Sequence, residues 1–283
     1  MKGLMRNHIS FLVWVMLVIG FTRPDKPSNI LVVGGLLQDI EVTGSGHLSE
    51  VSYIPGGSGH NVASILSTLG HSVYFVSVAP FNLVKHLKHF SYSLIPISRC
   101  SREGRMLYRE DLSVIGVQRP YHKGLSERMC SVLARSVFDL LYVTLELDNS
   151  LLELAARIDR SIGVIDIKPS FRINEVIHYL GSYDAIIANQ EEQRQLGEFD
   201  SQKLVRMRAE NGVVFRGKEY AFERSGRNKL GCGDILGAFM SNELLNDKDL
   251  TEAVVTATSI ASDYARKSHT LEEYIASLPR RTS

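Results

Sequence analysis

An aspartate that directly follows two glycines is the first feature of the sequence that could do chemistry. The stretch reads GCGDILGAF from Gly231 to Phe239, and an apolar, helix-like run begins near Asp234. Glycines at 231 and 233 allow a tight turn with free N–H groups, and a helix start adds the positive end of its dipole. The turn could bind a phosphoryl group, while Asp234 could accept a proton from a hydroxyl that attacks phosphorus. A glycine-rich turn in which Asp234 only caps the helix explains these residues equally well.

The second glycine-dense stretch is PGGSGHNVA, from Pro55 to Ala63. Bulky side chains are absent where a strand-like segment meets a helix, so a small polar ligand could approach the backbone closely. The side chain of Asn61 can both donate and accept hydrogen bonds. A tight turn with Asn61 as the helix N-cap is the alternative, and His60 is expected to be exposed in that turn. The chain has neither a GxGxxG dinucleotide fingerprint around Gly231 nor a GxxxxGK[ST] phosphate loop.

These stretches need elements to position them, and the pattern along the chain indicates an α/β fold. Short apolar runs alternate with segments of helical period, which is typical of βαβ units and a mostly parallel sheet. Residues 30–33 form a continuous apolar run, as expected of a strand buried on both faces. Residues 62–69 have apolar positions at i, i+3, i+4 and i+7, which predicts a helix packed on one face. In such a sheet ligands bind at the carboxyl ends of the strands.

Two segments have a different pattern. Residues 40–55 and 104–118 contain alternating residues and turn glycines, which are typical of antiparallel strands. We therefore expect a small antiparallel β lid beside a mostly parallel central sheet that is flanked by helices. An exposed lid could also pair edge to edge with a second copy in a homodimer.

Composition and charge exclude several classes of protein. The chain of 283 residues has a formal charge of +1, so no global field attracts nucleic acid, and we expect no nucleic-acid partner. Its three cysteines are odd in number and widely spaced, which fits neither a disulfide framework nor a CxxC metal site. Reduced thiols and a cytoplasmic location are therefore expected.

The N-terminus complicates the expected location. FLVWVMLVIGF, residues 11–21, has the dimensions of a signal-peptide core, although no small-x-small cleavage pattern follows it. We expect residues 1–28 to be an apolar leader and linker outside the fold, and residues 29–283 to form the domain. The leader is either a membrane-associating segment or an appendage with no targeting role.

The order of the motifs resembles one family. VVGGLLQD, GGSGHNVASILSTLG, NQEE and GCGDILGAF follow one another as do the motifs of the PfkB, or ribokinase-like, family of sugar and nucleoside kinases. The resemblance extends from about Ile30 to the C-terminus. It implies a ribokinase-like fold and an ATP- and Mg²⁺-dependent kinase that phosphorylates an alcohol group of a sugar or nucleoside. The motifs do not identify the acceptor.

The resemblance also implies roles for individual residues. Asp234 matches the catalytic base, and the turn before it matches the anion hole that stabilises charge on the transferred group. Asn189 and Glu192 of NQEE match the motif that organises Mg²⁺ and its water, with an exposed helix start as the alternative. Glu146 is similar to a glutamate that reaches the acceptor, with a solvent-exposed strand-end carboxylate as the alternative. The anion hole is expected at Gly231, Cys232 and Gly233, and the acceptor site at Asp39, Gly56, Gly57, Asn61 and Glu146.

The nucleotide side departs from the family pattern. A strand that normally ends in T-x-G-x-x-G reads VVFRGKEYAF here, with Arg216 near the small polar position and Gly217 as the remaining glycine. If Arg216 or Lys218 points at phosphate, positive charge could replace lost backbone contacts, so Arg216 and Gly217 are expected to bind nucleotide. If the segment points to solvent, the protein is a degenerate, non-catalytic relative that binds a small polyol or nucleoside.

Overall fold

The protein is described by a computed structural model. It describes residues 27–44, 47, 49–78, 91–97, 100–102, 105–109, 114–118, 121–122, 127–147, 149–168, 173–197, 199, 201–208, 211–222, 230–266 and 270–278. The apolar segment 11–21, with the rest of the expected leader up to residue 26, lies outside these residues. Among the described residues, no helix has both the length and the apolar character needed to cross a membrane.

A large sheet forms the centre of the molecule. In the described part of the chain it has nine strands in the order β15-β14-β13-β12-β11-β10-β1-β4-β5. The strands are β1 (Asn29–Val33), β4 (Ser72–Val78), β5 (Ser93–Ile97), β10 (Val137–Thr144), β11 (Asp159–Asp166), β12 (Ala185–Ala188), β13 (Leu204–Met207), β14 (Val213–Phe215) and β15 (Lys218–Tyr220). Strands from β5 to β13 pair in parallel, and β13, β14 and β15 pair antiparallel. The expected mostly parallel sheet is confirmed.

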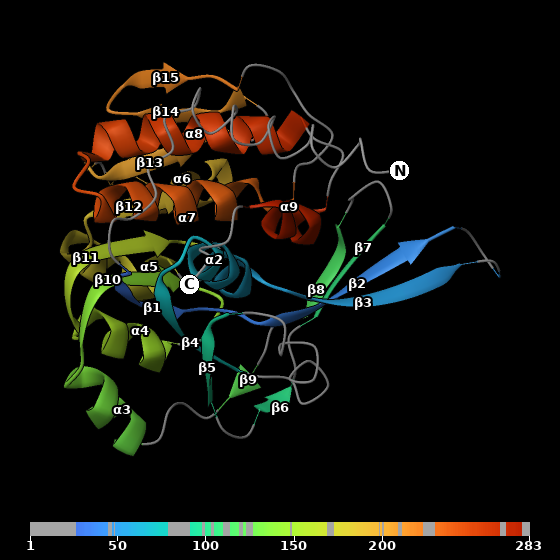
Figure 1. Cartoon of the computed structure of the whole chain (residues 1–283), viewed down its shortest axis with the longest axis horizontal. Coiled ribbons are helices and arrows are strands. Elements are labelled where there is room, and N and C mark those ends of the chain that lie inside the picture. The colour runs from blue at the N-terminus through green and yellow to red at the C-terminus, as the bar shows by residue number, and fades with distance from the viewer. Residues whose placement is uncertain are drawn as a thin grey trace, which may run out of the picture.

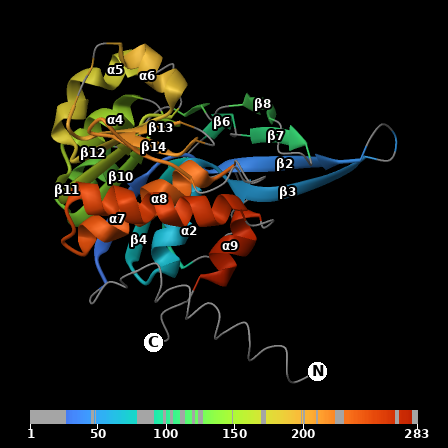
Figure 2. The same cartoon turned by 90° about the horizontal axis from the view of Figure 1, so that it is seen from above.

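Helices cover both faces of this sheet (Figures 1 and 2). One face carries α2 (Ser58–Thr68), α7 (Cys232–Leu245), α8 (Leu250–Arg266) and α9 (Leu271–Ser277). The other carries α3 (Glu127–Ala134), α4 (Asn149–Ala156), α5 (Ile173–Val176), the 3₁₀ turn η4 (Ile177–Ser182) and α6 (Gln190–Leu196). Ile30 and Val32 of β1 pack in the core under α2 and α7, whereas Leu31 and Val33 pack in the opposite core. The continuous apolar run at the start of the fold is therefore buried on both faces because alternate side chains serve two cores.

The lid is a second, smaller sheet that projects from the body (Figures 1 and 2). Its described strands are β2 (Leu37–Thr43), β3 (Glu50–Gly56), β7 (Arg105–Arg109) and β8 (Val114–Gln118), in the order β3-β2-β7-β8. β2–β3 and β7–β8 are antiparallel pairs, but β2 and β7 pair in parallel. The lid is therefore mixed rather than wholly antiparallel, because two hairpins join through strands that run the same way. A separate antiparallel pair joins β6 (Cys100–Arg102) to β9 (Tyr121–His122).

The order of the strands places the candidate residues at one edge of the central sheet. β1 is flanked by β10 and β4, and β10 is followed by β11 and β12, all running in the same direction. Their carboxyl ends therefore share an edge. β2 follows β1 after three residues and β3 leads directly into Gly57 and α2, so the base of the lid lies at this same edge.

Candidate active site

The glycine turn forms the start of α7. Gly231 is the N-cap and has a φ of 84°, a left-handed conformation that suits glycine. Asp234 is the third residue of the helix and is 4% exposed, so it is a buried residue of the first turn and not the cap. N–H groups in the first turn of a helix have no acceptor within the helix. Gly233 and Asp234 thus present N–H groups beside a buried carboxylate, an arrangement that suits a bound anion.

Asn61 contacts Asp234 directly. Its Nδ2 donates a hydrogen bond of 2.6 Å to Asp234 Oδ2. The N-cap of α2 is Gly57, with a φ of 94°, so the alternative in which Asn61 caps the helix is wrong. The two glycine-dense stretches therefore meet at one point, as the order of the motifs predicts.

Lys168 is a residue of this site that sequence analysis missed. It follows β11, and its Nζ donates to Asp234 Oδ1 at 3.2 Å and lies 3.1 Å from Asp166 Oδ2 in an ion pair. Asp166 is fully buried and the Lys168 side chain is 27% exposed. Burial lowers the pKa of Lys168, but the charges of Asp166 and Asp234 outweigh burial and hold this pKa well above its usual value. Lys168 is therefore a fixed positive charge between two carboxylates.

Asp39 of β2 supplies an acceptor at the base of the lid. Its carboxylate packs against Gly56, where any Cβ would overlap the carboxylate oxygens. Burial, aided by the charges of Glu146 and Asp234, raises the pKa of Asp39 to about 8. Asp39 Oδ1 is buried and has no hydrogen-bond partner among the described residues. A buried oxygen without a partner is costly, so a ligand hydroxyl at this position would satisfy it.

Glu146 is held by donors from three segments of the chain. Its side chain accepts hydrogen bonds from the backbone N–H groups of Gly35 (2.9 Å), Ser58 (3.2 Å) and Gly59 (3.2 Å) and from the Thr144 hydroxyl (2.9 Å). It is thus not a free solvent-exposed carboxylate, and contact between Glu146 and an acceptor stays a prediction. Glu146 instead ties the end of β1 to the start of α2.

The backbone at this junction is packed too closely for side chains. A Cβ on Gly59 would lie 2.7 Å from the carbonyl carbon of Gly34, and one on Gly57 would lie 2.7 Å from the Gly35 oxygen. Real Cβ atoms are not found at such distances, so glycines are required where β1 meets α2. Gly57 therefore shapes the junction before α2 through its backbone.

Asn189 and Glu192 form a capping box at the start of α6. Asn189 Oδ1 accepts from the N–H groups of Glu191 and Glu192, and Glu192 Oε2 accepts from Asn189 N at 2.7 Å. Glu192 is only 2% exposed, so the alternative of an exposed helix start is wrong for this residue. Burial raises the pKa of Glu192, and hydrogen bonds from Asn189 oppose the shift.

The fit to a divalent cation rests on two carboxylates. No group of three or more His, Cys, Asp or Glu side chains among the described residues could hold a metal ion. Apart from its ion pair with Lys168, Asp166 has no hydrogen-bond partner for either oxygen among those residues. Burial raises the pKa of Asp166; the positive charge of Lys168 opposes this shift and the negative charge of Glu192 adds to it. Mg²⁺ keeps most of its water and binds through one or two carboxylates, so Asp166 and Glu192 fit it.

Comparisons with known proteins by sequence and by structure give different results. By sequence, no family model matches the chain and no curated protein matches it significantly. By structure, the chain is similar to a ribokinase from Thermotoga maritima, with a TM-score of 0.68, 18% identity, and coverage of 90% of this chain and 97% of that one. It is similar to adenosine kinase from Sinorhizobium meliloti, with a TM-score of 0.65, 15% identity, and coverage of 89% and 99%. It is also similar to the Arabidopsis thaliana ribokinase complexed with ribose and ATP, with a TM-score of 0.65, 15% identity, and coverage of 90% of this chain and 96% of that one.

The chain has the ribokinase fold. The similarity covers nearly the whole of each compared chain, which confirms the expected fold class. Within this ribokinase fold, the candidate residues on β2, α2, α6 and α7 gather at the carboxyl edge of the central sheet. The nucleotide-side residues do not.

Arg216 and Gly217 lie at the opposite edge of the ribokinase-fold sheet. β14 runs antiparallel to β13, with Phe215 opposite Val205, so the turn after Phe215 lies where β13 begins. Arg216 is exposed and donates to the Gln202 carbonyl and the Thr251 hydroxyl, each at 3.2 Å. The expectation that Arg216 and Gly217 bind nucleotide is therefore corrected, because the hairpin turns them away from the site.

The end of β13 borders the glycine turn instead. A Cβ on Gly233 would lie 3.2 Å from Cε of Met207, the last residue of β13. The direction of β14 could not be predicted, because the hydrophobic pattern of a short strand gives no signal of its direction.

His60 and Tyr142 are two further buried side chains near the site. His60 differs from the expectation, and Tyr142 was not singled out in the sequence. His60 is 3% exposed rather than turn-exposed, and its ring pairs with the Tyr92 hydroxyl at 2.8 Å. Burial lowers the pKa of His60 to about 3. Tyr142 of β10 is fully buried, its hydroxyl has no partner among the described residues, and Gly237 of α7 packs against it.

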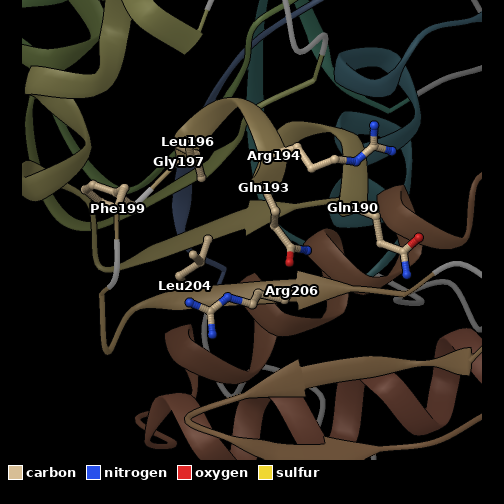
Figure 3. A pocket seen from close by; sticks show the side chains of 8 residues that line it. All are labelled: Gln190, Gln193, Arg194, Leu196, Gly197, Phe199, Leu204 and Arg206. Carbon is tan, nitrogen blue, oxygen red and sulfur yellow. The ribbon is translucent and has the colours of Figure 1, made fainter.

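A cavity of about 440 Å³ lies between α6 and β13 (Figure 3). Gln190, Gln193 and Arg194 of α6 line one side and Leu204 and Arg206 of β13 the other. It contains none of the residues assigned to the site above. We assign no role to this cavity in the chemistry.

Proposed function

We propose that the chain is an ATP- and Mg²⁺-dependent phosphotransferase of the PfkB type that acts on an alcohol group of a sugar or nucleoside. The observation that carries the proposal is Asp234, buried at the start of α7, where Asn61 and Lys168 donate to its two oxygens. A carboxylate in that position accepts the proton of the attacking hydroxyl next to the turn that receives the phosphoryl group.

The residues divide into an acceptor side and a phosphate side. On the acceptor side, Asp39 Oδ1 accepts from a ligand hydroxyl and Asn61 orients Asp234. The acceptor oxygen forms a bond to the γ-phosphorus, the bond from this phosphorus to the ADP oxygen breaks, and the proton passes to Asp234. On the phosphate side, the N–H groups of the 231–233 turn stabilise the charge on the transferred group.

Asp166 and Glu192 are the groups that would hold Mg²⁺. When bound, the ion neutralises phosphate charge and aligns the phosphates. Support for ATP comes from the compared ribokinase complexed with ribose and ATP. Because a kinase needs ATP and ATP is abundant in the cytoplasm, we propose that the protein is cytoplasmic. Cell fractionation can test this location.

The lid supports a proposal on assembly. β3 is the outer strand of the described four-stranded lid, and Val51 and Tyr53 on it are 48% and 57% exposed. An unpaired edge strand with apolar side chains can pair with a second copy. We propose a homodimer through β3, which sedimentation of the wild type and of Tyr53→Lys can test. A monomeric wild type at assay concentration contradicts it.

The first test is ATP binding by calorimetry with Mg²⁺ on the full-length chain. Glu192→Ala should weaken binding by about tenfold or more, because the cation loses a carboxylate and α6 loses its cap. Glu191→Ala, an exposed neighbour in the same helix turn, is the matched control and should leave affinity unchanged. Binding would justify screening sugars and nucleosides, with Asp234→Asn as the inactive control. A well-folded chain that binds no ATP, even with acceptors present, contradicts the kinase.

A second candidate function is a non-catalytic protein that binds a small polyol or nucleoside. Both oxygens of Asp234 already accept hydrogen bonds from protein groups, and Arg216 and Gly217 do not reach the site. Binding of a sugar or nucleoside that depends on Asp39 but is unaffected by ATP would favour this second function. Acceptor-dependent release of ADP would exclude it.

A further inference from the structure

Lys168 is placed where a phosphoryl group would arrive. Its Nζ is 3.2 Å from Asp234 Oδ1 and 3.1 Å from Asp166 Oδ2. A Cβ added to Gly233 would lie 2.7 Å from the same Nζ. The ammonium group therefore touches both the candidate base and the anion-binding turn.

Among the described residues, the contacts of the Lys168 ammonium group account for two of its three N–H donors. An ammonium carries three N–H donors, and the described contacts of Lys168 Nζ involve two carboxylates, Asp166 and Asp234. The third donor remains for a group bound beside the turn. The side chain is 27% exposed, so a ligand can approach it although Asp166 is fully buried.

We propose that Lys168 is a catalytic residue whose ammonium group contacts the transferring phosphoryl group at the 231–233 turn, with Asp166 as the positioning residue that holds it there. This inference rests on the proposed phosphotransferase function and names a residue that the resemblance does not supply. Lys168 keeps its protons throughout. The acceptor proton passes to Asp234, the acceptor oxygen bonds to phosphorus, and the bond from phosphorus to the ADP oxygen breaks.

The ammonium group of Lys168 adds a full positive charge, which the backbone N–H groups of the turn do not provide. Backbone N–H groups provide partial charges only, whereas a phosphoryl group in transfer carries negative charge on three oxygens. A cation placed in advance in a partly buried site stabilises that charge strongly, because little solvent has to reorganise. A single lysine thus contacts the proton acceptor and the developing negative charge at once.

A purely structural role is the alternative, since Lys168 also neutralises buried carboxylates. Lys248 offers a matched comparison: its side chain is 24% exposed and pairs with the fully buried Glu243. Lys168 differs because it lies between two carboxylates and against a helix N-terminus. A structural lysine would affect stability at both positions, but only Lys168 would affect recognition of a terminal phosphate.

The test compares ATP and ADP, which differ by the phosphoryl group that Lys168 contacts. Calorimetry with Mg²⁺ on the full-length chain should show that Lys168→Met weakens ATP binding at least tenfold and leaves ADP binding within about twofold. Lys248→Met should leave the ratio of the two affinities unchanged. Equal losses for ATP and ADP, or no loss, overturn the inference while the proposed function stands.

A second variant guards against misfolding. Lys168→Met leaves Asp166 buried without its counter-ion, which can destabilise the chain. Lys168→Met combined with Asp166→Asn removes both charges and should fold, as circular dichroism can verify. Because Asp166 is also one of the two groups proposed to hold Mg²⁺, the reference for this double variant is Asp166→Asn alone. Relative to that reference, the same selective loss of ATP affinity is expected, and an ATP-to-ADP ratio equal to that of Asp166→Asn overturns the inference.

Inorganic pyrophosphate separates this inference from the proposed function. If the wild type binds no nucleotide, the proposed function fails, and pyrophosphate then probes the turn alone. Pyrophosphate binding that Lys168→Met abolishes and Lys248→Met retains would uphold the anion contact. Absence of such binding, or binding that is independent of Lys168, overturns the contact as well.

Discussion

Asn61 on α2 donates a hydrogen bond of 2.6 Å to Asp234 on α7, across a separation of 173 positions in the chain. Neither residue caps its helix, so the contact is not a by-product of helix formation. It joins the glycine-dense stretch at the start of α2 to the glycine turn at the start of α7. The carboxylate is thereby fixed in one orientation.

The orientation of Asp234 predicts the effect of removing Asn61. Asn61→Ala should lower the rate of phosphoryl transfer by about 10- to 100-fold, with a smaller change in ATP affinity, because a misplaced base costs mainly catalysis. Asn61→Asp should be worse, since it sets a second carboxylate against Asp234. Steady-state kinetics with the best acceptor measures both. Unchanged turnover in Asn61→Ala would show that the contact does not orient the base.

The hydrogen bonds that Glu146 accepts predict that its replacement lowers the stability of the fold. Glu146→Gln leaves one oxygen for the N–H groups of Gly35 and Gly59, which both contact Oε2, and turns an NH₂ group toward other donors. Unfolding in urea should show a loss of about 1–3 kcal/mol, typical of buried donors left without acceptors. Glu153→Gln, at an exposed position of α4, is the control and should lie within about 0.5 kcal/mol of wild type. A stable Glu146→Gln with weaker acceptor binding would instead support direct contact with the acceptor.

The packing of Tyr142 against Gly237 predicts a compensating pair of changes. A Cβ at position 237 would overlap the Tyr142 hydroxyl, so Gly237→Ala should destabilise the chain by about 1–3 kcal/mol. Tyr142→Phe removes a buried hydroxyl that has no partner among the described residues, so alone it should be nearly neutral. The double variant should recover part of the loss in thermal unfolding, because the ring atoms Cζ and Cε2, which phenylalanine keeps, still lie 2.9 and 3.1 Å from the added Cβ. Additive effects of the two changes would contradict this contact.

Asp39 predicts a pH dependence of stability. Its folded-state pKa of about 8 lies above the ordinary value of 3.8, so between these values the folded chain binds a proton that the unfolded chain has released. The free energy of unfolding should therefore fall as pH rises from about 4 to about 8. From pH 5 to pH 8 this group contributes a loss of at most about 4 kcal/mol, which Asp39→Asn should remove. Urea unfolding of both chains at these pH values tests it, and parallel curves would contradict it.

The sequence predicts the local elements and the glycine motifs because both are recorded in neighbouring residues. The apolar run of β1 and the helical period of α2 arise from short-range spacing, and the order of the motifs fixes which strand ends meet. The resemblance of these motifs to a known family named Asp234, Asn61 and Asp39 as candidates, and the structure places Asn61 against Asp234.

What the sequence does not reveal depends on pairing between distant strands. Arg216 looks like a residue of the site until the antiparallel register of β13 and β14 turns it to the other edge. Lys168 lies two residues after Asp166 in a stretch that matches no motif, and its contact with Asp234 exists only because α7 brings that residue to it. The resemblance named Glu146 as a candidate, but three of its four described donors are backbone N–H groups, which carry no side-chain signature.

Because α7 lies late in the chain, it is synthesised after all the described strands. Strands β1 to β15 and the helix that carries Asn61 all precede residue 221, whereas Asp234 follows them on α7. A chain emerging from the ribosome has every described strand before it has its candidate base, and the apolar surface of α2 that α7 later covers stays uncovered in the meantime. A truncated product that ends before α7 would therefore expose apolar surface, be prone to aggregate and lack the candidate base. During the last fifth of translation, this uncovered apolar surface is the part of the chain that a chaperone would have to shield from aggregation.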